Sequence, residues 1–317
     1  MTHDVDDRAR RRFLGATAAG TAALATSLVV PGTAHANLPS ATRRRGYCDG
    51  PYGLVHFYDN GANGRPLIMF HQAPMSARQF DSVYAPLAKR GIRAIGIDMP
   101  GFGMSDPTSF VPRCEDWAKV APAVLDHLHI RRADVLGHHT GSMVATEVGV
   151  QFPQRVRSLV VNGAMPMGEA ERAERLESQK HSEIEFVYQK DGSHLTASFM
   201  TRYRMYGGDD GAKTGAIADP KVITRYTVER FQGFGPFWYG HYAAFKYDHE
   251  KGLRALKVRT MILTNTGDMI YEHNQRARAM RPDFEYAELQ GGGVDIVDQQ
   301  PEAWCDVVAK FLAGGPR

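Results

Sequence analysis

The chain has 317 residues, 43% of them hydrophobic, so it is long enough to bury one large domain or two small ones. Its formal net charge is only +3, which does not favour nucleic acid or an anionic membrane as the main partner. The three scattered cysteines, Cys48, Cys114 and Cys305, are too few for a disulfide scaffold or a zinc site, and the sequence does not pair them.

Residues 1–36 show the three regions of a secretory signal peptide in order. The stretch RRRFL, residues 10–14, resembles a twin-arginine signal, and an uncharged apolar run follows to residue 30. That run is too short and too weakly hydrophobic for a membrane span, and Ala-His-Ala at 34–36 matches an A-x-A cleavage site. We therefore expect export through the twin-arginine machinery, to the periplasm or outside the cell, with 37–317 as the mature chain.

Short apolar runs alternate with helical patterns along the mature chain. Strands are predicted over 67–70, 94–97, 134–136, 156–161, 258–264 and 284–289. Helices are predicted over 117–130, 144–152 and 302–312. This alternation is typical of an α/β fold, with a doubly wound, mainly parallel sheet that helices cover on both faces.

The segment from about 165 to 250 interrupts the alternation. It is charged over 169–185, and it is rich in glycine and aromatic residues over 233–250. An insertion of this size between two strands is typical of a cap over a pocket. We expect most of its aromatic side chains to pack and some to face a ligand.

The residues Gly-His-His-Thr-Gly at 137–141 stand between a predicted strand and a predicted helix. In that setting a Gly-x-Ser-x-Gly sequence presents a nucleophilic serine at the top of an α/β sheet. Here His139 occupies the position of the serine. The sequence therefore predicts a nucleophile elbow that carries an imidazole.

Four further motifs occur in a fixed order around this elbow. They are FHQAPMSARQF at 70–80, IDMPGFGMSD at 97–106, LTNTGDMIY at 263–271 and LQGGGVDIVDQQPEAW at 289–304. Together with the elbow, they resemble the α/β-hydrolase family over nearly the whole mature chain. The resemblance implies the α/β-hydrolase fold with a cap insertion, maps the triad acid to Asp268, and assigns an oxyanion-hole N–H group to the loop at 70–80.

Two departures from the family pattern concern the catalytic triad itself. The position of the triad histidine, seven residues before Pro301, is occupied by Val294, and no histidine follows His273. The usual order of serine, acid and histidine is thus broken at two of its three places. A third departure is Gln72, where the loop usually has glycine after its histidine.

An imidazole at the elbow reaches further than a hydroxyl group, toward the space that Val294 leaves open. We therefore expect a hydrogen-bonded dyad of His139 and Asp268, in which His139 is a general base and contributes ~10²–10⁴-fold. The backbone N–H groups of Thr140 and of Gln72 or Ala73 are the expected oxyanion hole. Two other roles for His139, a nucleophile that forms an acyl-imidazole and an inert remnant, stay open.

Three more polar residues are candidates for supporting roles. His71 is expected to hold the oxyanion loop, His138 to pack, and Asp295 to act as a second acid or to cap its loop. A metal site built from the histidines is disfavoured because adjacent histidines at an elbow diverge. No metal and no cofactor are expected.

The function that these residues favour is hydrolysis of a small, largely apolar ester, lactone or activated carbonyl compound. The same base and oxyanion hole would also serve a cofactor-free lyase or isomerase. A ligand-binding protein that has kept the pocket and lost the chemistry is the alternative outside enzymes. The partner expected is a small-molecule substrate, and the sequence does not set the oligomeric state.

Overall fold

The computed structural model describes residues 43–205 and 219–314. The predicted signal peptide lies outside these residues, so export stays a prediction. No helix within the described ranges is long and apolar enough to cross a membrane. Cys48, Cys114 and Cys305 are all buried and unpaired.

Within the described residues, eight strands form one sheet in the order β1-β2-β4-β3-β5-β6-β7-β8. Their bounds are β1 Arg44–Gly50, β2 Gly53–Asp59, β3 Arg65–Phe70, β4 Ile92–Ile97, β5 Ala133–His138, β6 Val156–Asn162, β7 Thr260–Asn265 and β8 Glu285–Leu289. From β4 to β8 all neighbours are parallel, whereas β1 and β2 pair antiparallel at one edge. The prediction of a mainly parallel α/β sheet is confirmed, and the strand that ends at the elbow lies in its interior.

The antiparallel strands β1 and β2 were not predicted from the sequence. Strand β1 is an edge strand whose side chains are mostly exposed, and Arg44 and Arg45 in it face solvent. An edge strand needs no continuous apolar run, and charge on an edge discourages pairing with other chains. The charged sequence of β1 therefore did not indicate a strand.

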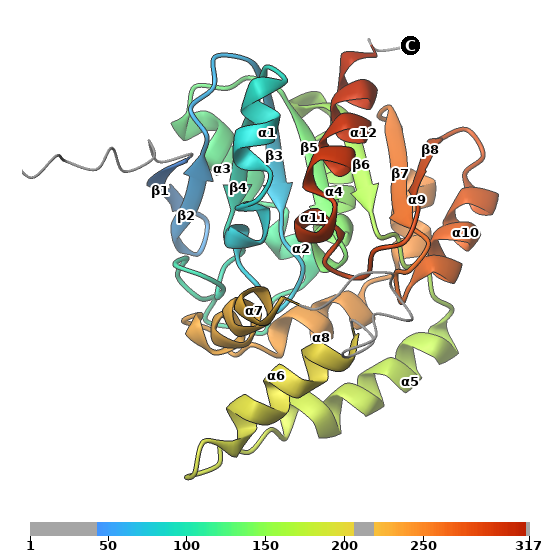
Figure 1. Cartoon of the computed structure of the whole chain (residues 1–317). Helices are drawn as coiled ribbons and strands as arrows, with labels where there is room; N and C mark the ends of the chain where they lie inside the picture. The colour runs from blue at the N-terminus through green and yellow to red at the C-terminus, as the bar shows by residue number, and fades with distance from the viewer. Residues whose placement is uncertain (1–42, 206–218, 315–317) are drawn as a thin grey trace, which may run out of the picture. The chain divides into compact units, whose positions relative to one another are not determined.

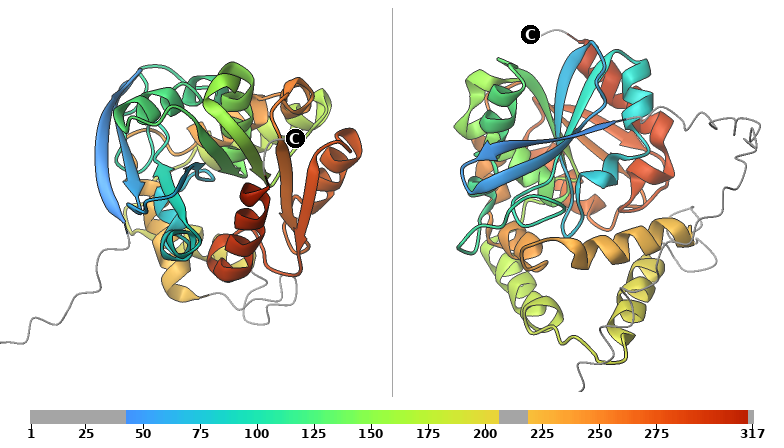
Figure 2. Two further views of the ribbon diagram at one scale, coloured as in Figure 1. Left: turned by 90° about the horizontal axis from the view of Figure 1, so that it is seen from above. Right: turned by 90° about the vertical axis from the view of Figure 1, so that its left-hand side faces the viewer.

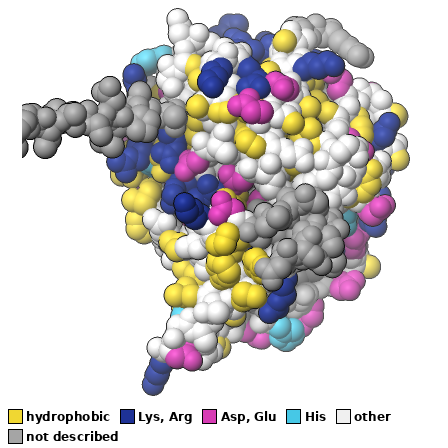
Figure 3. Space-filling view, viewed as in Figure 1, with side chains coloured by type: hydrophobic (Ala, Val, Ile, Leu, Met, Phe, Trp, Pro, Cys, Tyr) yellow, Lys and Arg dark blue, Asp and Glu magenta, His cyan; other side chains and the backbone are white. Residues whose placement is uncertain are grey.

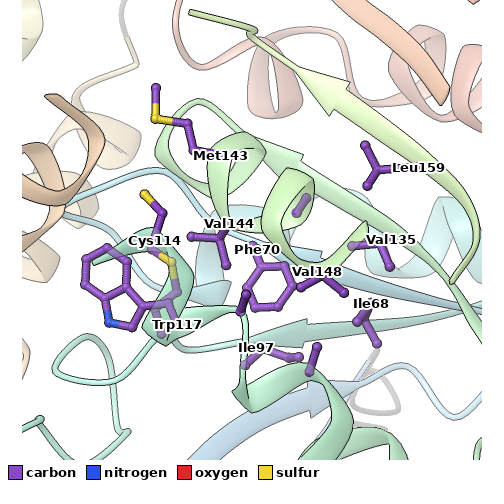
Figure 4. Close-up of a cluster of buried hydrophobic side chains, with 14 of the residues drawn as sticks. Ile68, Phe70, Ile97, Cys114, Trp117, Val135, Met143, Val144, Val148 and Leu159 are labelled. Carbon is purple, nitrogen blue, oxygen red and sulfur yellow. The ribbon is translucent and has the colours of Figure 1, made fainter. Parts of the chain in front are cut away.

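Helices cover both faces of the sheet (Figures 1 and 2). Helices α1 Tyr84–Lys89, α11 Ile296–Gln299 and α12 Pro301–Ala313 pack on one face. Helices α2 Cys114–Trp117, α3 Val120–His127, α4 Thr140–Gln151, α9 His249–Ala255 and α10 Tyr271–Met280 pack on the other. Short helical turns complete these layers at η1 Ala77–Phe80 and η2 Pro153–Arg155. Figure 4 shows the hydrophobic core on this second face of the sheet, where Phe70, Val144 and Val148 meet between β3 and α4.

The helix predicted over 117–130 is shorter in the structure: it corresponds to α3, and the short helix α2 ends at Trp117, just before it. Pro122 lies in the first turn of α3 and has no N–H group to donate to the carbonyl of Ala118. A continuous helix would require that bond. The chain therefore breaks between α2 and α3, with Pro122 placed where a helix tolerates it.

The insertion between β6 and β7 is helical where the structure describes it. It contains α5 Glu169–Gln179, a π-helical turn η3 Lys180–Ile184, α6 Ser193–Met205, α7 Pro220–Gln232 and α8 Tyr239–Lys246. Figure 1 shows these helices together at one end of the sheet. Several of their large side chains, including Val187, Tyr188 and Val228, are exposed, and Figure 3 shows hydrophobic and charged side chains side by side on this part of the surface.

The two ends of the cap segment are tied by one buried histidine. The N–H group of Met165, where the chain leaves β6, donates to Nδ1 of His249 at 3.2 Å. Thr146 donates its hydroxyl proton to Ser142, so its oxygen accepts the Nε2–H of His249 at 3.1 Å. The contact with Met165 requires an unprotonated Nδ1 and therefore an uncharged ring, and burial lowers the pKa of His249 to about 3.

We expect this histidine to make the fold acid-sensitive. Below about pH 6.5, the unfolded chain binds a proton on His249 that the folded chain refuses until about pH 3. The free energy of unfolding should therefore fall with decreasing pH across this window, at up to about 1.4 kcal/mol per pH unit. Urea titrations of wild type and His249→Gln at a series of pH values test this.

The variant should show a shallower pH dependence between pH 6.5 and 4, whatever its stability at pH 8. His181→Gln removes a histidine that is 65% exposed and should leave the slope unchanged. A slope in His249→Gln equal to that of wild type would contradict the prediction.

Candidate active site

The elbow holds His139 in a backbone conformation that side chains rarely adopt. His139 follows β5 and precedes α4, with φ 49° and ψ −115°. A Cβ atom on Gly137 would lie 1.8 Å from the carbonyl oxygen of Gly141, and one on Gly141 would lie 2.1 Å from that of Phe70. Only glycine fits at these two positions, so the sharp turn depends on both.

His139 makes the contact with Asp268 that the sequence suggested. Its Nε2 atom lies 2.8 Å from Oδ2 of Asp268, a residue in the loop after β7. The carboxylate is fully buried, whereas the imidazole remains 14% exposed. Gly163 makes room for the ring, because a Cβ atom there would lie 2.6 Å from Cδ2 of His139. That the pair is catalytic stays a prediction.

The structure removes one of the proposed oxyanion donors. The N–H group of Gln72 donates to Oε1 of Gln79 at 2.7 Å, so it does not face a substrate. Within the described residues, the N–H groups of Ala73 and Thr140 donate to no protein acceptor. Both residues line the same cavity as His139. Of the predicted oxyanion-hole residues, Ala73 and Thr140 are therefore the two whose N–H groups remain available, and their role stays a prediction.

His71 holds the oxyanion loop, as expected. Its Nδ1 lies 2.8 Å from the carbonyl oxygen of Gln72, and its Nε2 accepts the N–H of Met99 at 3.1 Å. Burial lowers the pKa of the ring, so it stays neutral and keeps both contacts. His71 therefore connects the loop after β3 to the loop after β4.

His138 packs beneath the elbow, also as expected. It is fully buried, Gln79 donates to its Nδ1, and burial lowers its pKa well below the usual value. Its ring centroid lies 4.6 Å from that of His139. His138 is therefore a neutral neighbour of the dyad, and its place in the structure gives it no route to a substrate.

Asp295 does not face the cavity as a second acid. It is fully buried, and its Oδ1 accepts a hydrogen bond from Nε2 of Gln72 at 2.8 Å. It forms an ion pair with Arg202 of α6, whose Nε lies 2.9 Å from Oδ2. It also precedes α11 as its N-cap residue, although its side chain makes no capping bond there. Asp295 thus connects the cap to the oxyanion loop, a role that the sequence did not suggest.

One cavity of about 480 Å³ lies between the elbow and the cap. Its core side includes Ala73, His139, Thr140 and Val294, the residue at the vacated triad position. Its cap side mixes apolar residues with polar and charged ones: Met165, Arg175, Ser182, Glu183, Phe186, Ala197, Ser198, Thr201, Arg202, Met205, Tyr226, Thr227, Arg230, His241, Ala244 and Phe245. The volume suits a small molecule, but a largely apolar substrate would match only part of this lining.

No metal centre is apparent in the parts of the chain that the structure describes. There, no group of three or more His, Cys, Asp or Glu side chains is arranged to hold an ion. His71, His138 and His139 each use ring nitrogens for protein contacts instead.

The sheet order, the elbow and the cap match one known family. A family model described as alpha/beta hydrolase fold matches residues 65–291. The chain belongs to the α/β-hydrolase fold family. Within this family, a non-heme haloperoxidase of Rhodococcus erythropolis is 35% identical over 227 residues, which are 69% of this chain and 80% of the relative.

Other members of the family are similar over shorter stretches or in fold alone. A 2-hydroxy-6-oxononadienedioate/2-hydroxy-6-oxononatrienedioate hydrolase of Cupriavidus pinatubonensis is 34% identical over 34% of this chain. The chain spans only 39% of the length of that relative and 42% of a Pseudomonas hydrolase of the same name. The structure of a Bacillus anthracis bromoperoxidase superposes with a TM-score of 0.71 at 17% identity, over 86% of this chain and all of the other.

Sequence reasoning missed several residues that shape the site. Gln79, which is hydrogen-bonded to both Gln72 and His138, lies within the motif at 70–80, but no sequence pattern indicates these contacts. Gly163 is a glycine just after a predicted strand, a signal that could have indicated a close approach. Arg202 and Arg230 lie in the cap, whose helices the sequence did not place over the elbow.

Proposed function

We propose that the protein is a hydrolase of a small ester, lactone or activated carbonyl compound, with His139 as general base. The observation that carries this proposal is the 2.8 Å contact between His139 Nε2 and the fully buried carboxylate of Asp268, at the edge of a cavity. A buried carboxylate orients the ring and favours its protonated form, which is what a general base requires.

In this proposal each group of the site has a separate task. Nε2–H of His139 donates to Asp268, which leaves Nδ1 as the basic nitrogen. It takes a proton from a water molecule as the water oxygen attacks the substrate carbonyl. The N–H groups of Ala73 and Thr140 then stabilise the oxyanion, at roughly 3–4 kcal/mol for each working donor. His139 returns the proton to the leaving group as the tetrahedral intermediate breaks down.

Two of the relatives support an activated ketone as the substrate, since both are named as hydrolases of hydroxy-oxo acids. A lyase or isomerase would use the same base and oxyanion hole but would add no water. A binding protein would hold such compounds without converting them.

A substrate panel run in water that carries a heavy oxygen isotope separates the three readings. We expect turnover of at least one ester, lactone or activated ketone, with one heavy oxygen in the acid product. A serine-reactive fluorophosphonate should not label the elbow. Turnover without solvent oxygen in the product would replace hydrolysis by lyase or isomerase chemistry. Tight binding of the panel compounds without turnover would support the third hypothesis, a binding protein without catalytic activity.

A further inference from the structure

The cap side of the cavity carries an excess of positive charge. Three arginines line it, Arg175, Arg202 and Arg230, against one carboxylate, Glu183. The charge of Arg202 is offset by Asp295, with which it forms a direct ion pair. Arg175 is exposed, which leaves Arg230 as the enclosed cation to be explained.

Arg230 extends from α7 into a ring of aromatic side chains. Its guanidinium carbon lies 4.4 Å from the ring centroid of Phe237, 5.6 Å from that of Phe186 and 5.7 Å from that of Phe231. These faces attract a cation, but they accept no ordinary hydrogen bond. The five N–H donors of the guanidinium therefore need acceptors elsewhere.

The protein supplies Arg230 with an incomplete set of acceptors. The nearest carboxylate oxygen, Oε1 of Glu183, lies 3.7 Å away, and it already accepts from His241 at 2.8 Å. The other oxygen of Glu183 accepts from Gln179 at 3.1 Å. Among the described residues no acceptor is hydrogen-bonded to Arg230, and its Nε is fully enclosed. Burial, together with the charge of Arg202, lowers the pKa of Arg230.

The Arg230 side chain is only 19% exposed, and a largely enclosed cation with few hydrogen-bond acceptors favours a ligand that supplies them. We propose that Arg230 is the anchor for a carboxylate on the substrate. The guanidinium fork fits a carboxylate by two parallel hydrogen bonds. Taken with the proposed function, on which this step rests, the substrate is a small keto acid or ester acid. Its carboxylate meets Arg230 in the cap, and its reacting carbonyl faces His139, Ala73 and Thr140 in the core.

Binding of two unreactive probes tests the anchor without relying on turnover. The probes are levulinate, a keto acid, and levulinamide, its uncharged primary amide. By calorimetry at low salt, wild type should bind levulinate about ten- to a hundredfold more tightly than levulinamide. The difference should shrink as salt is added. Arg230→Gln should lose this difference and bind levulinamide as wild type does.

The matched control is Lys221→Gln, which removes an exposed positive charge from the same helix, away from the cavity lining. It should keep the preference for levulinate, and Arg230→Lys should keep part of it. Wild type that binds the two probes equally, or binds neither at millimolar concentration, overturns the proposal. An unchanged preference in Arg230→Gln overturns the assignment to Arg230.

These binding outcomes do not depend on whether the proposed hydrolase activity is found. His139→Ala should keep the preference for levulinate even if no substrate is turned over, because the anchor lies on the cap. If Arg230→Gln does not fold, as judged by circular dichroism, the comparison of probes in wild type and in Arg230→Lys decides the matter. Equal binding of both probes by both proteins then counts against the anchor.

Discussion

His139→Ala should lower kcat/KM for the identified substrate by about 10²–10⁴-fold, the usual contribution of a positioned general base. Asp268→Asn should cause a loss of the same order, because an amide no longer stabilises the imidazolium. The double variant should be little worse than either single one, since the two side chains act as a unit through the contact at 2.8 Å. Steady-state kinetics on the three purified variants measure this.

Two controls make this result specific. His127→Ala removes an exposed histidine on α3 and should retain wild-type kinetics. His139→Ser should not restore activity, because Val294 supplies no base for the new hydroxyl group. The paired change His139→Ser with Val294→His rebuilds the triad of the family in sequence, and it is the variant in which fluorophosphonate labelling should appear. Wild-type turnover by His139→Ala would show that the elbow histidine is a remnant.

Gly141→Ala should destabilise the protein by about 3 kcal/mol or more, at the upper end of overpacking effects. The added Cβ atom would lie 2.1 Å from the carbonyl oxygen of Phe70 and 2.7 Å from that of His71. Both oxygens belong to the backbone where β3 ends, so neither can move without disturbing the centre of the sheet. Chemical denaturation, with the yield of soluble protein beside it, tests the expectation.

Two other glycines provide graded controls for this change. A Cβ atom on Gly149, in the same helix α4, would crowd only the ends of the Leu256 and Leu159 side chains, which can shift, and would make an ordinary contact with Val258. Gly168 has open space around its Cβ position. Gly149→Ala should therefore be mild and Gly168→Ala close to neutral. If Gly141→Ala were as stable as Gly168→Ala, the close packing at the elbow would be wrong.

The His139–Asp268 contact shows how an imidazole can reach the acid from a new direction. The proposed base and one proposed oxyanion donor, the N–H of Thr140, both lie in the same sharp turn. The close backbone approach in this turn requires glycine at 137 and 141, because a Cβ atom at either position would clash with a carbonyl oxygen. Gly163 leaves the space that the imidazole needs, and Val294 lines the same cavity as His139.

The sequence by itself determined the parallel strands, the elbow, the existence of a cap and the pairing of His139 with Asp268. Buried parallel strands are continuous apolar runs, and the elbow is a local motif with two required glycines, so both can be read from neighbouring residues. The edge strand β1 could not, because an exposed edge strand has no such run, and its largely buried neighbour β2 was not predicted either.

The tertiary structure alone decided which polar groups remain available at the site. The N–H of Gln72 is used by Gln79, seven residues away, and Asp295 is used by Gln72 and by Arg202 from the cap. Arg230 is enclosed by aromatic side chains that lie at separate points of the cap sequence. Hydrogen bonding and desolvation depend on which residues are neighbours in space. Packing of the cap over the elbow brings together residues that are far apart in the sequence, and the sequence does not show these contacts.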